Sequence, residues 1–158
     1  MHPNEKLLAI REYIPADCSQ ITDLFYQTVH SVNAADYTKE QLDAWAPVAA
    51  DREKWNRSLL AHYSLVAVHG ETIVGFGDIA ETGYLDRLYV HKDHQRQGIA
   101  TVICHRLERI TAQRNISVHA SITAKPFFEN RGYHIVKKQQ VKRHGICLIN
   151  YWMEKSMR

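Results

Sequence analysis

The chain has 158 residues, of which 45% are hydrophobic and 23% charged, with 20 basic and 17 acidic side chains and a formal net charge of +3. A chain of this length is typical of one domain with a substantial core, so we expect a single domain over residues 1–158. The net charge is too small to indicate a nucleic-acid-binding protein. No apolar run approaches the ~20 residues of a membrane span.

The first third of the chain is predicted to form one strand and three helices. Residues 7–14 are predicted to form the strand. Asp17 and Gln20 then have the spacing of a helix N-cap and its capping-box partner. Apolar residues recur at helical spacing after them, at Ile21, Leu24, Phe25, Val29 and Val32. A second capping box at residues 38–41 and the segment 51–62 predict two further helices.

The middle of the chain is predicted to form strands around one helix. Residues 64–68 and 72–76 flank a His-Gly turn and predict a hairpin, and residues 84–90 predict the next strand. A helix follows, and residues 116–122 return as a strand. The apolar face of that helix is predicted to carry Ile99, Val102, Ile103, Leu107 and Ile110. A strand, a helix and a strand in succession form a crossover unit, so the two strands should be parallel.

The C-terminal part is predicted to form a short helix and a two-stranded ribbon. Thr123 has the residue type of an N-cap, and Gly132 that of the glycine that ends a helix. Residues 133–136 and 146–153 are then predicted to be strands. The basic residues at positions 137–144 indicate a solvated hairpin, and the alternative is a basic nucleic-acid-binding module with salt-sensitive affinity. The element order predicts an α+β fold with a mixed sheet and one parallel crossover.

The turn between residues 90 and 101 is the most informative part of the sequence. It follows a short apolar strand and opens an amphipathic helix, which is an arrangement that binds diphosphates through backbone N–H groups and the helix dipole. Gly98 and Ala100 carry little or no side chain, so a phosphate can approach the backbone there. The chain contains no Walker A sequence, and Gly75 and Gly77 lie within a strand that no helix follows, which excludes a dinucleotide fingerprint.

Two segments resemble the GNAT N-acetyltransferases. Gln95-x-x-Gly98-x-Ala100, after a strand that ends in Leu-Tyr-Val, is similar to the acetyl-CoA loop of that family. The segment 124–133 is similar to the family's Ala-x-x-Phe-Tyr-Glu-Lys-x-Gly-Phe segment. The resemblance covers the whole chain in element order. It implies a mixed sheet of six or seven strands with flanking helices and one parallel crossover at the cofactor site.

The resemblance also implies how acetyl-CoA is held, with no metal ion. The pantetheine would insert between the two parallel strands and bond to their main chain, and the turn would hold the diphosphate. The N–H of Leu88 would also polarise the thioester carbonyl. The cofactor-binding residues implied in this way are Leu88, Val90, Gln95, Arg96, Gln97, Gly98, Ala100, Thr101, Phe127 and Phe128.

The implied reaction is the direct attack of a primary amine on the thioester. A free amine with a pKa near ~10 is mostly protonated at pH 7, so a base must remove a proton, directly or through water. Strand alternation places Asp86 on one face with Tyr84 and Leu88, which makes Asp86 a candidate base. Asp78 and Glu81 are alternatives that would act through water.

The general acid of many family members is absent. Their tyrosine is replaced here by Phe128, which has no proton to donate. Ser121 stands where many members carry asparagine, so either Ser121 is the proton donor or the thiolate leaves without one. Tyr133 is expected to be a core aromatic instead. The missing tyrosine gives weight to an alternative function, a non-catalytic regulator that binds acetyl-CoA.

The acceptor site is expected near the front of the chain. Residues 30–37 link two helices, and Asp36 would meet a cationic amine while Tyr37 or Trp45 stacks on it. The acceptor is either a small-molecule amine or a lysine of a peptide or protein, and we expect neither a membrane nor a nucleic acid as partner. The C-terminal ribbon would support a homodimer. The ten histidines show no metal-binding spacing.

The cysteines and the N-terminus indicate the compartment. Cys18, Cys104 and Cys147 lie far apart and form no Cys-x-x-Cys spacing, which predicts reduced thiols that pack as small buried hydrophobes. Because the first residues also lack the apolar core of a signal peptide, we expect a cytoplasmic protein.

Overall fold

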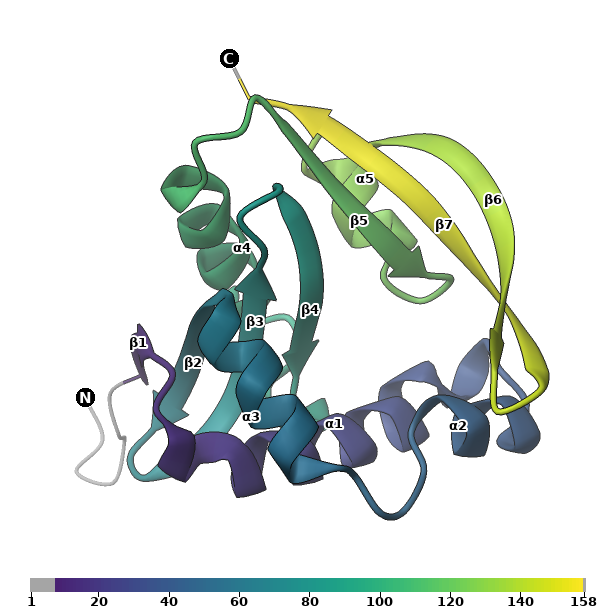
Figure 1. Ribbon diagram of the computed structural model, residues 1–158, viewed down its shortest axis with the longest axis horizontal. Coiled ribbons are helices and arrows are strands. Elements are labelled where there is room, and N and C mark those ends of the chain that lie inside the picture. The colour runs from purple at the N-terminus through teal and green to yellow at the C-terminus, as the bar shows by residue number, and fades with distance from the viewer. Residues whose placement is uncertain (1–7, 158) are drawn as a thin grey trace.

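The computed structural model describes residues 8–157, which form a seven-stranded mixed sheet with helices on both faces (Figure 1). The strands are β1 (Leu8–Glu12), β2 (Tyr63–His69), β3 (Thr72–Ile79), β4 (Tyr84–Val90), β5 (Asn115–Ser121), β6 (His134–Arg143) and β7 (Ile146–Ser156). The helices are α1 (Cys18–Ser31), α2 (Lys39–Trp45), α3 (Arg52–Ala61), α4 (Ile99–Ile110) and α5 (Lys125–Asn130), with short 3-10 turns η1 (Pro15–Asp17), η2 (Val32–Ala35) and η3 (Lys92–His94). The predicted fold class is confirmed, and Leu7, the predicted start of the first strand, lies outside the described residues.

The strand order is β1-β2-β3-β4-β5-β7-β6, and β4 and β5 form the parallel pair, as predicted. Their register contains only Tyr84 with Ser117 and Leu85 with Val118. Beyond these pairs the two strands diverge, and Figure 1 shows the resulting V between them. The C-terminal ribbon is longer than predicted, because β6 and β7 pair almost to the turn at residues 144–145.

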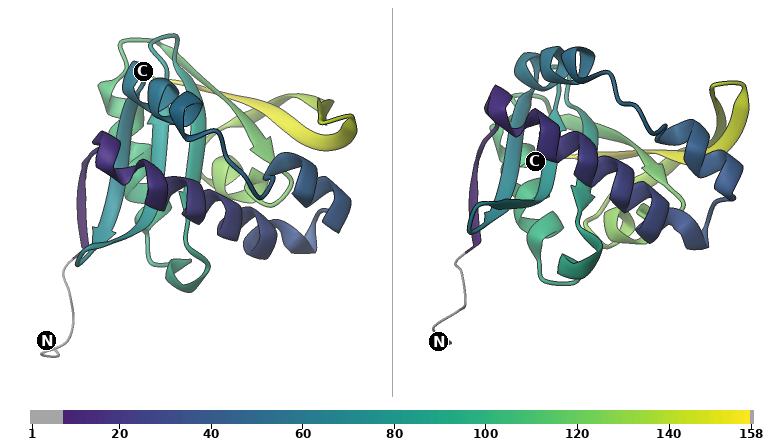
Figure 2. Two further views of the ribbon diagram at one scale, coloured as in Figure 1. Left: turned by 60° about the horizontal axis from the view of Figure 1, so that its bottom comes forward. Right: turned by 90° about the horizontal axis from the view of Figure 1, so that it is seen from below.

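Helices α1 and α3 cover one face of the sheet, and α4 and α5 lie on the other (Figure 2). Ile99, Ile103 and Leu107 of α4 are at most 2% exposed, as predicted. Val102 and Ile110 are 43% and 53% exposed, so the prediction that they line the packed face together with these residues was wrong. The buried face of α4 follows the four-residue spacing from Ile99 to Leu107; Val102 lies to one side of it, and Ile110 is the last residue of the helix.

A glycine in β3 allows α4 to lie close to the sheet. A Cβ at Gly77 would come within 2.9 Å of Ile103 Cγ2 and 3.0 Å of the Arg87 carbonyl oxygen. No real Cβ atom fits such contacts without movement of the neighbours. The small residue is therefore a packing requirement that lets α4, the helix after the turn at residues 90–98, lie close to the strands.

Two predicted helix caps are wrong. Asp17 has helical backbone angles rather than the extended ones of an N-cap, and its carboxylate accepts hydrogen bonds from Arg11 (2.8 and 2.9 Å) and from the Ile14 N–H (3.0 Å). Thr123 donates its hydroxyl to Asp36 instead of capping α5. The capping box of α2 is confirmed, because Thr38 and Gln41 exchange side-chain and backbone bonds of 3.2 and 2.9 Å.

The thiols are free, and their packing differs from the prediction at one position. Cys18 and Cys104 are buried, as expected, whereas Cys147 is exposed on the outer part of β7. Among the described residues, no helix combines the length and the apolar character that crossing a membrane requires.

Candidate active site

The V between β4 and β5 leaves main-chain groups of β4 without a strand partner. The His91 N–H donates to the Val74 carbonyl oxygen at 2.8 Å, and Leu88 pairs with Gly77. Because antiparallel hydrogen bonds alternate along a strand, the N–H groups of Tyr89 and Arg87 also face β3, and those of Leu88 and Val90 face the gap. These are the two residues predicted to bond the pantetheine.

A cavity of about 160 Å³ occupies the wide end of the V. Its walls include many of the residues predicted for the site: Leu88, Val90, Gln95, Ala100, Ser121, Phe127 and Phe128. It also reaches Asn33 of η2, so the N-terminal segment closes one side. The tertiary structure thus brings both family-like segments to one place.

The turn before α4 has the backbone shape of an anion site. Arg96 and Gly98 have φ angles of 61° and 82°. A Cβ at Gly98 would meet no heavy atom within 4 Å, so the space beside the backbone is open. The first helical bond runs from the Val102 N–H to the Gly98 carbonyl oxygen, so the N–H groups of Ile99, Ala100 and Thr101 have no partner within the helix. These groups suit a diphosphate.

Gln95 contributes its side chain, a role that the sequence did not reveal. Its Nε2 donates to the Val90 carbonyl oxygen at 2.5 Å, at the end of β4. This bond fixes the start of the turn to the strand. The same hydrogen bond engages the Val90 carbonyl group, which faces the gap. The N–H groups of Leu88 and Val90 and the carbonyl group of Leu88 therefore remain free on the gap side of β4.

The aromatic residues of the second segment form the floor of the cavity. Phe128 is 3% exposed, and its ring lies against Phe127 (ring centroids 5.2 Å apart) and Tyr133 (5.1 Å). Tyr133 is a core aromatic, as predicted, and its hydroxyl donates to Glu108 at 2.7 Å.

Glu108 is a buried carboxylate that sequence reasoning missed. Arg131 donates to it at 2.5 Å and Lys155 at 3.4 Å, so it joins α4 to the end of α5 and to β7. Burial alone would raise the pKa of Glu108, but the hydrogen bonds from Arg131 and Tyr133 lower it below the usual value. The network fixes α4, which carries the cofactor turn, to the other side of the V.

Ser121 lies at the end of β5, in the wall of the cavity. Its hydroxyl oxygen accepts hydrogen bonds from the Ala124 N–H at 3.0 Å and from Asn33 Nδ2 at 3.4 Å. Both bonds use the oxygen as acceptor, so the hydroxyl proton can be donated to a group in the cavity.

The strand alternation predicted for Asp86 is interrupted by a β-bulge. Asp78 pairs with Arg87 and Ile79 with Leu85, so Asp86 is an extra residue that faces none on β3. Leu85 and Leu88 consequently share the α4 side of the sheet. The prediction that Asp86 shares one face of the strand with Leu88 is wrong, because Asp86 Oδ2 lies 3.6 Å from Arg87 Nη2 whereas Leu88 packs on the α4 side.

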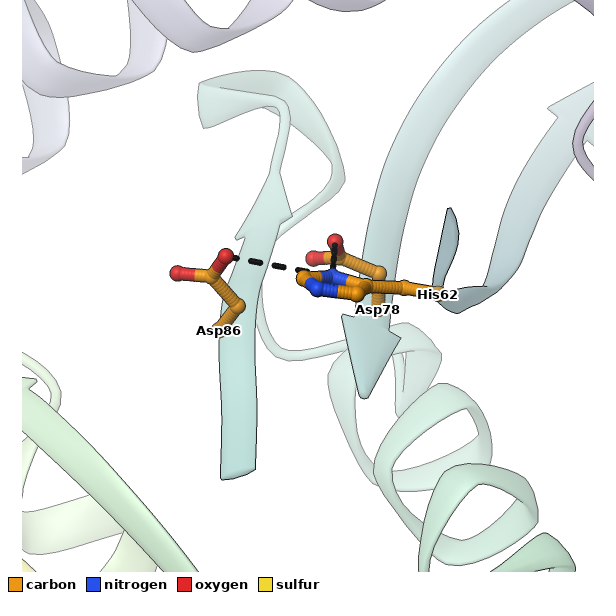
Figure 3. Close-up of side chains that lie close together, drawn as sticks. All are labelled: His62, Asp78 and Asp86. Carbon is orange, nitrogen blue, oxygen red and sulfur yellow. Dashed lines mark hydrogen bonds and ion pairs between the residues drawn. The ribbon is translucent and has the colours of Figure 1, made fainter. Parts of the chain in front are cut away.

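A charged cluster surrounds Asp86, and Figure 3 shows three of its members pointing toward one another. His62 Nδ1 lies 2.7 Å from Asp78 Oδ2 and 3.9 Å from Asp86 Oδ2. Arg87 Nη1 donates to the same Asp78 oxygen at 2.6 Å and stacks 4.6 Å above Trp55. The hydrogen bond to Asp78 raises the pKa of His62. His62, Asp78 and Asp86 are ligand types for a metal ion, but the Arg87 guanidinium already supplies positive charge there.

Asp78 and Asp86, two of the three candidate bases, differ in their exposure to solvent. Asp78 is fully buried and holds His62 and Arg87, whereas Asp86 has a side chain 29% exposed. Asp86 therefore has the access that a base needs.

The residues predicted for the acceptor are in structural contacts. Asp36 accepts a bond of 2.7 Å from Thr123. The Tyr37 hydroxyl donates to the Ile149 carbonyl oxygen at 2.7 Å and accepts from the Ile122 N–H at 2.9 Å. Its ring packs edge-on against Trp45, with centroids 5.4 Å apart. Tyr37 and Trp45 still line a second, smaller cavity beside the first.

Comparison with known proteins identifies the fold and the family. A family model described as an acetyltransferase (GNAT) domain matches residues 33–155. The chain is also 34% identical over 146 residues to the uncharacterized N-acetyltransferase YafP of Escherichia coli, and this match covers 92% of this chain and 94% of that protein. The chain belongs to the GNAT acetyltransferase family.

Solved GNAT structures resemble the whole chain. A GCN5-related N-acetyltransferase from Rhodopseudomonas palustris has a TM-score of 0.91 and 31% identity, with 99% of this chain and all of that chain covered (100%). The PaiA N-acetyltransferase of Thermoplasma acidophilum, solved in complex with coenzyme A, has a TM-score of 0.76 at 17% identity, and the match covers 95% of this chain and 99% of that chain. The similarity to the PaiA structure is therefore a similarity of fold.

Proposed function

We propose that this GNAT protein transfers the acetyl group of acetyl-CoA to a primary amine, by direct attack within a ternary complex. The observation that carries the proposal is the gap beside β4, where the N–H groups of Leu88 and Val90 face an open cavity instead of a strand. A pantetheine chain can pair with such groups in the way a strand does. The proposal covers residues 1–158 as one domain.

The residues present fit the diphosphate and the pantetheine. The N–H groups of Arg96, Gly98, Ala100 and Thr101 would surround the diphosphate, and the open space beside Gly98 leaves room for it. Gln95 would hold the turn, and Gln97 lies exposed beside it. Phe127 and Phe128 would form the apolar floor. Acetyl-CoA, when bound, supplies an acetyl group activated as a thioester.

Three residues would act on the reacting atoms. The Leu88 N–H would donate to the thioester carbonyl oxygen, where negative charge develops. Asp86 would take the proton of the acceptor amine through one water, because it is the accessible carboxylate of its cluster. Ser121 would donate a hydrogen bond to the leaving sulfur, since its oxygen already accepts two bonds.

A screen for CoA release tests the function. The purified protein is given acetyl-CoA and amines from several classes: small amines, amino acids, peptides and protein lysines. We expect release of free CoA in proportion to the acetylated product with at least one class. Tight acetyl-CoA binding without turnover of any amine would contradict the transferase and favour the non-catalytic regulator, for which the replacement of tyrosine by Phe128 is the supporting observation.

The oligomeric state belongs to the same proposal. Strand β6 lies at one edge of the sheet, and Ile135 and Val136 on it are 41% and 44% exposed. An exposed edge with apolar side chains suits pairing with a second copy. Sedimentation of the purified protein tests for the homodimer.

A further inference from the structure

A second cavity of about 50 Å³ opens on the V beside the first and shares Ser121 with it. Its walls combine aromatic, neutral polar and cationic side chains: Tyr37, Trp45, His119, Arg143 and Asn150. The first cavity lies beside the cofactor turn, so the second is the place left for the acceptor. The polar groups in it then describe what the acceptor must carry.

The β6–β7 hairpin that carries Arg143 is fixed to the N-terminal helices. The Tyr37 hydroxyl donates to the Ile149 carbonyl oxygen at 2.7 Å. Gln41 Nε2 donates to the Cys147 carbonyl oxygen at 3.1 Å, and His144 Nδ1 to that of Ala44 at 2.9 Å. Arg143 therefore extends from an anchored backbone.

The Arg143 guanidinium has no carboxylate partner within 4.0 Å among residues 8–157, and its hydrogen bond goes to the Lys142 carbonyl oxygen at 3.2 Å. It lines the cavity together with His119, whose ring lies 5.2 Å from that of Tyr84. Burial, and after it the charge of Arg143, lower the pKa of His119. Arg143 is thus a cation without a carboxylate partner at the edge of this cavity.

Asn150 adds an unused acceptor. Its Oδ1 is buried, and no donor among the described residues reaches it. A buried acceptor without a donor is costly, so it favours a ligand with an N–H group.

We propose that the acceptor is a small primary amine that also bears a carboxylate, with the carboxylate on Arg143 and the amine beside Asn150 and Ser121. This inference rests on the proposed transfer to an amine. A guanidinium binds a carboxylate through two parallel hydrogen bonds, and it repels a second ammonium group. Diamines and polyamines are therefore poor acceptors, and a short carbon chain separates the two charged ends.

Matched acceptors test the inference. CoA release is measured with ω-amino carboxylates of increasing length, with their carboxamides, and with diamines of the same length. At the best length we expect kcat/KM for the carboxylate to exceed that for the carboxamide about tenfold, with the diamine lowest. In Arg143→Gln the difference should disappear through a higher KM, with kcat little changed. Lys142→Gln, a neighbouring charge outside the cavity, should keep the difference.

Two outcomes would overturn the inference. One is equal kcat/KM for carboxylate and carboxamide in both the parent and Arg143→Gln. The other arises if the protein releases no CoA with any amine, in which case the transferase proposal fails. The Tm of the protein loaded with acetyl-CoA is then measured with and without the ω-amino carboxylates. A rise in Tm that is lost in Arg143→Gln supports the anion site, and the absence of such a rise overturns the inference as well.

Discussion

Asp86 occupies its position because β4 holds one residue more than β3 opposite it. The bulge directs its carboxylate to Arg87 and His62, and Asp86 lies two residues before Leu88, whose N–H faces the gap. Asp86→Asn keeps the shape and removes the basicity. We expect the maximal rate to fall roughly 100-fold and the acidic limb of the pH profile to flatten, with little change in acetyl-CoA affinity.

Steady-state kinetics from pH 6 to pH 9 and calorimetry check this, with the exposed Asp23→Asn as the matched control. Full activity of Asp86→Asn across that range would remove Asp86 from the mechanism. Glu81 or water alone would then be the remaining base.

Ser121 has a hydroxyl that is both a structural acceptor and a candidate donor. Ser121→Ala removes the partner of the Ala124 N–H, which should lower the free energy of unfolding by about 1 kcal/mol. It should also lower the maximal rate a few-fold and change the pH–rate profile. Phe128→Tyr restores the family's usual hydroxyl in the same cavity, so its activity should equal or exceed that of the parent.

The kinetics of the two variants decide between the two accounts of the leaving group. An unchanged rate and profile in Ser121→Ala, with only a lower Tm, would assign the residue a structural role and leave the thiolate to depart unprotonated.

His62 makes stability depend on pH. Its pKa is raised in the folded protein by the hydrogen bond to Asp78, above the usual value of about 6.5. Its stabilising contribution is therefore fully present below pH 6.5 and is lost as the pH rises through the folded pKa. We expect the Tm difference between the parent and His62→Gln to be largest below pH 6.5 and to shrink above it. A difference that is constant or grows with pH would contradict the assignment; the exposed His105→Gln is the control.

At the scale of elements, the turn and helix α4 act as one unit. The helix is held by Gly77 below it and by Glu108 at its far end, and the turn is held by Gln95. What remains free is the row of N–H groups beside Gly98. The proposed anion site is therefore part of a strand–turn–helix unit with fixed ends, and blocking its open space should affect binding more than folding.

Gly98→Glu tests this. The new side chain would fill the diphosphate space and add like charge, and we expect acetyl-CoA binding to be lost with a modest fall in Tm from the φ of 82°. Gly145→Glu is the matched control, because Gly145 has a φ of 79° and equally open surroundings in the β6–β7 turn. Calorimetry should show normal acetyl-CoA affinity in the control. Unchanged affinity in a folded Gly98→Glu would refute the phosphate turn.

At the scale of the whole molecule, the two halves of the sheet share few hydrogen bonds. The β4–β5 register holds two residue pairs, yet one hydrophobic cluster joins both sides, with Leu85 and Ile103 on one and Val118 and Met153 on the other. Since burial rather than strand pairing joins the halves, the chain should unfold as one cooperative unit.

Calorimetry and circular dichroism should therefore show one coincident transition. Acetyl-CoA at about 100 times its Kd should stabilise the fold by about 2.7 kcal/mol, which corresponds to a rise in Tm of about 5–10 °C. Two separate transitions would show that the V divides the chain into independent parts and would contradict the single domain.

The fold was predictable because its signals are local. Strand and helix periods, the capping box at Thr38 and the small residues of the cofactor turn are visible within a few positions of one another, and the parallel crossover follows from element order. The two aromatic residues of the second segment and Ser121 were named as site residues through the resemblance to the family, and they line the first cavity. Val102 was misplaced because a wide apolar stripe does not define its own edges, and Ile110 because periodicity does not show where the packed part of a helix ends.

The sequence by itself determined the order of the elements and the backbone shape of the turn, since both depend on short spans of the chain. The tertiary structure alone decided the bulge at Asp86, its cluster with His62 and the closure of the second cavity by Arg143. These residues come from separate elements whose spacing in the chain follows no period. Their meeting depends on how the sheet and its hairpin pack, which no local pattern encodes.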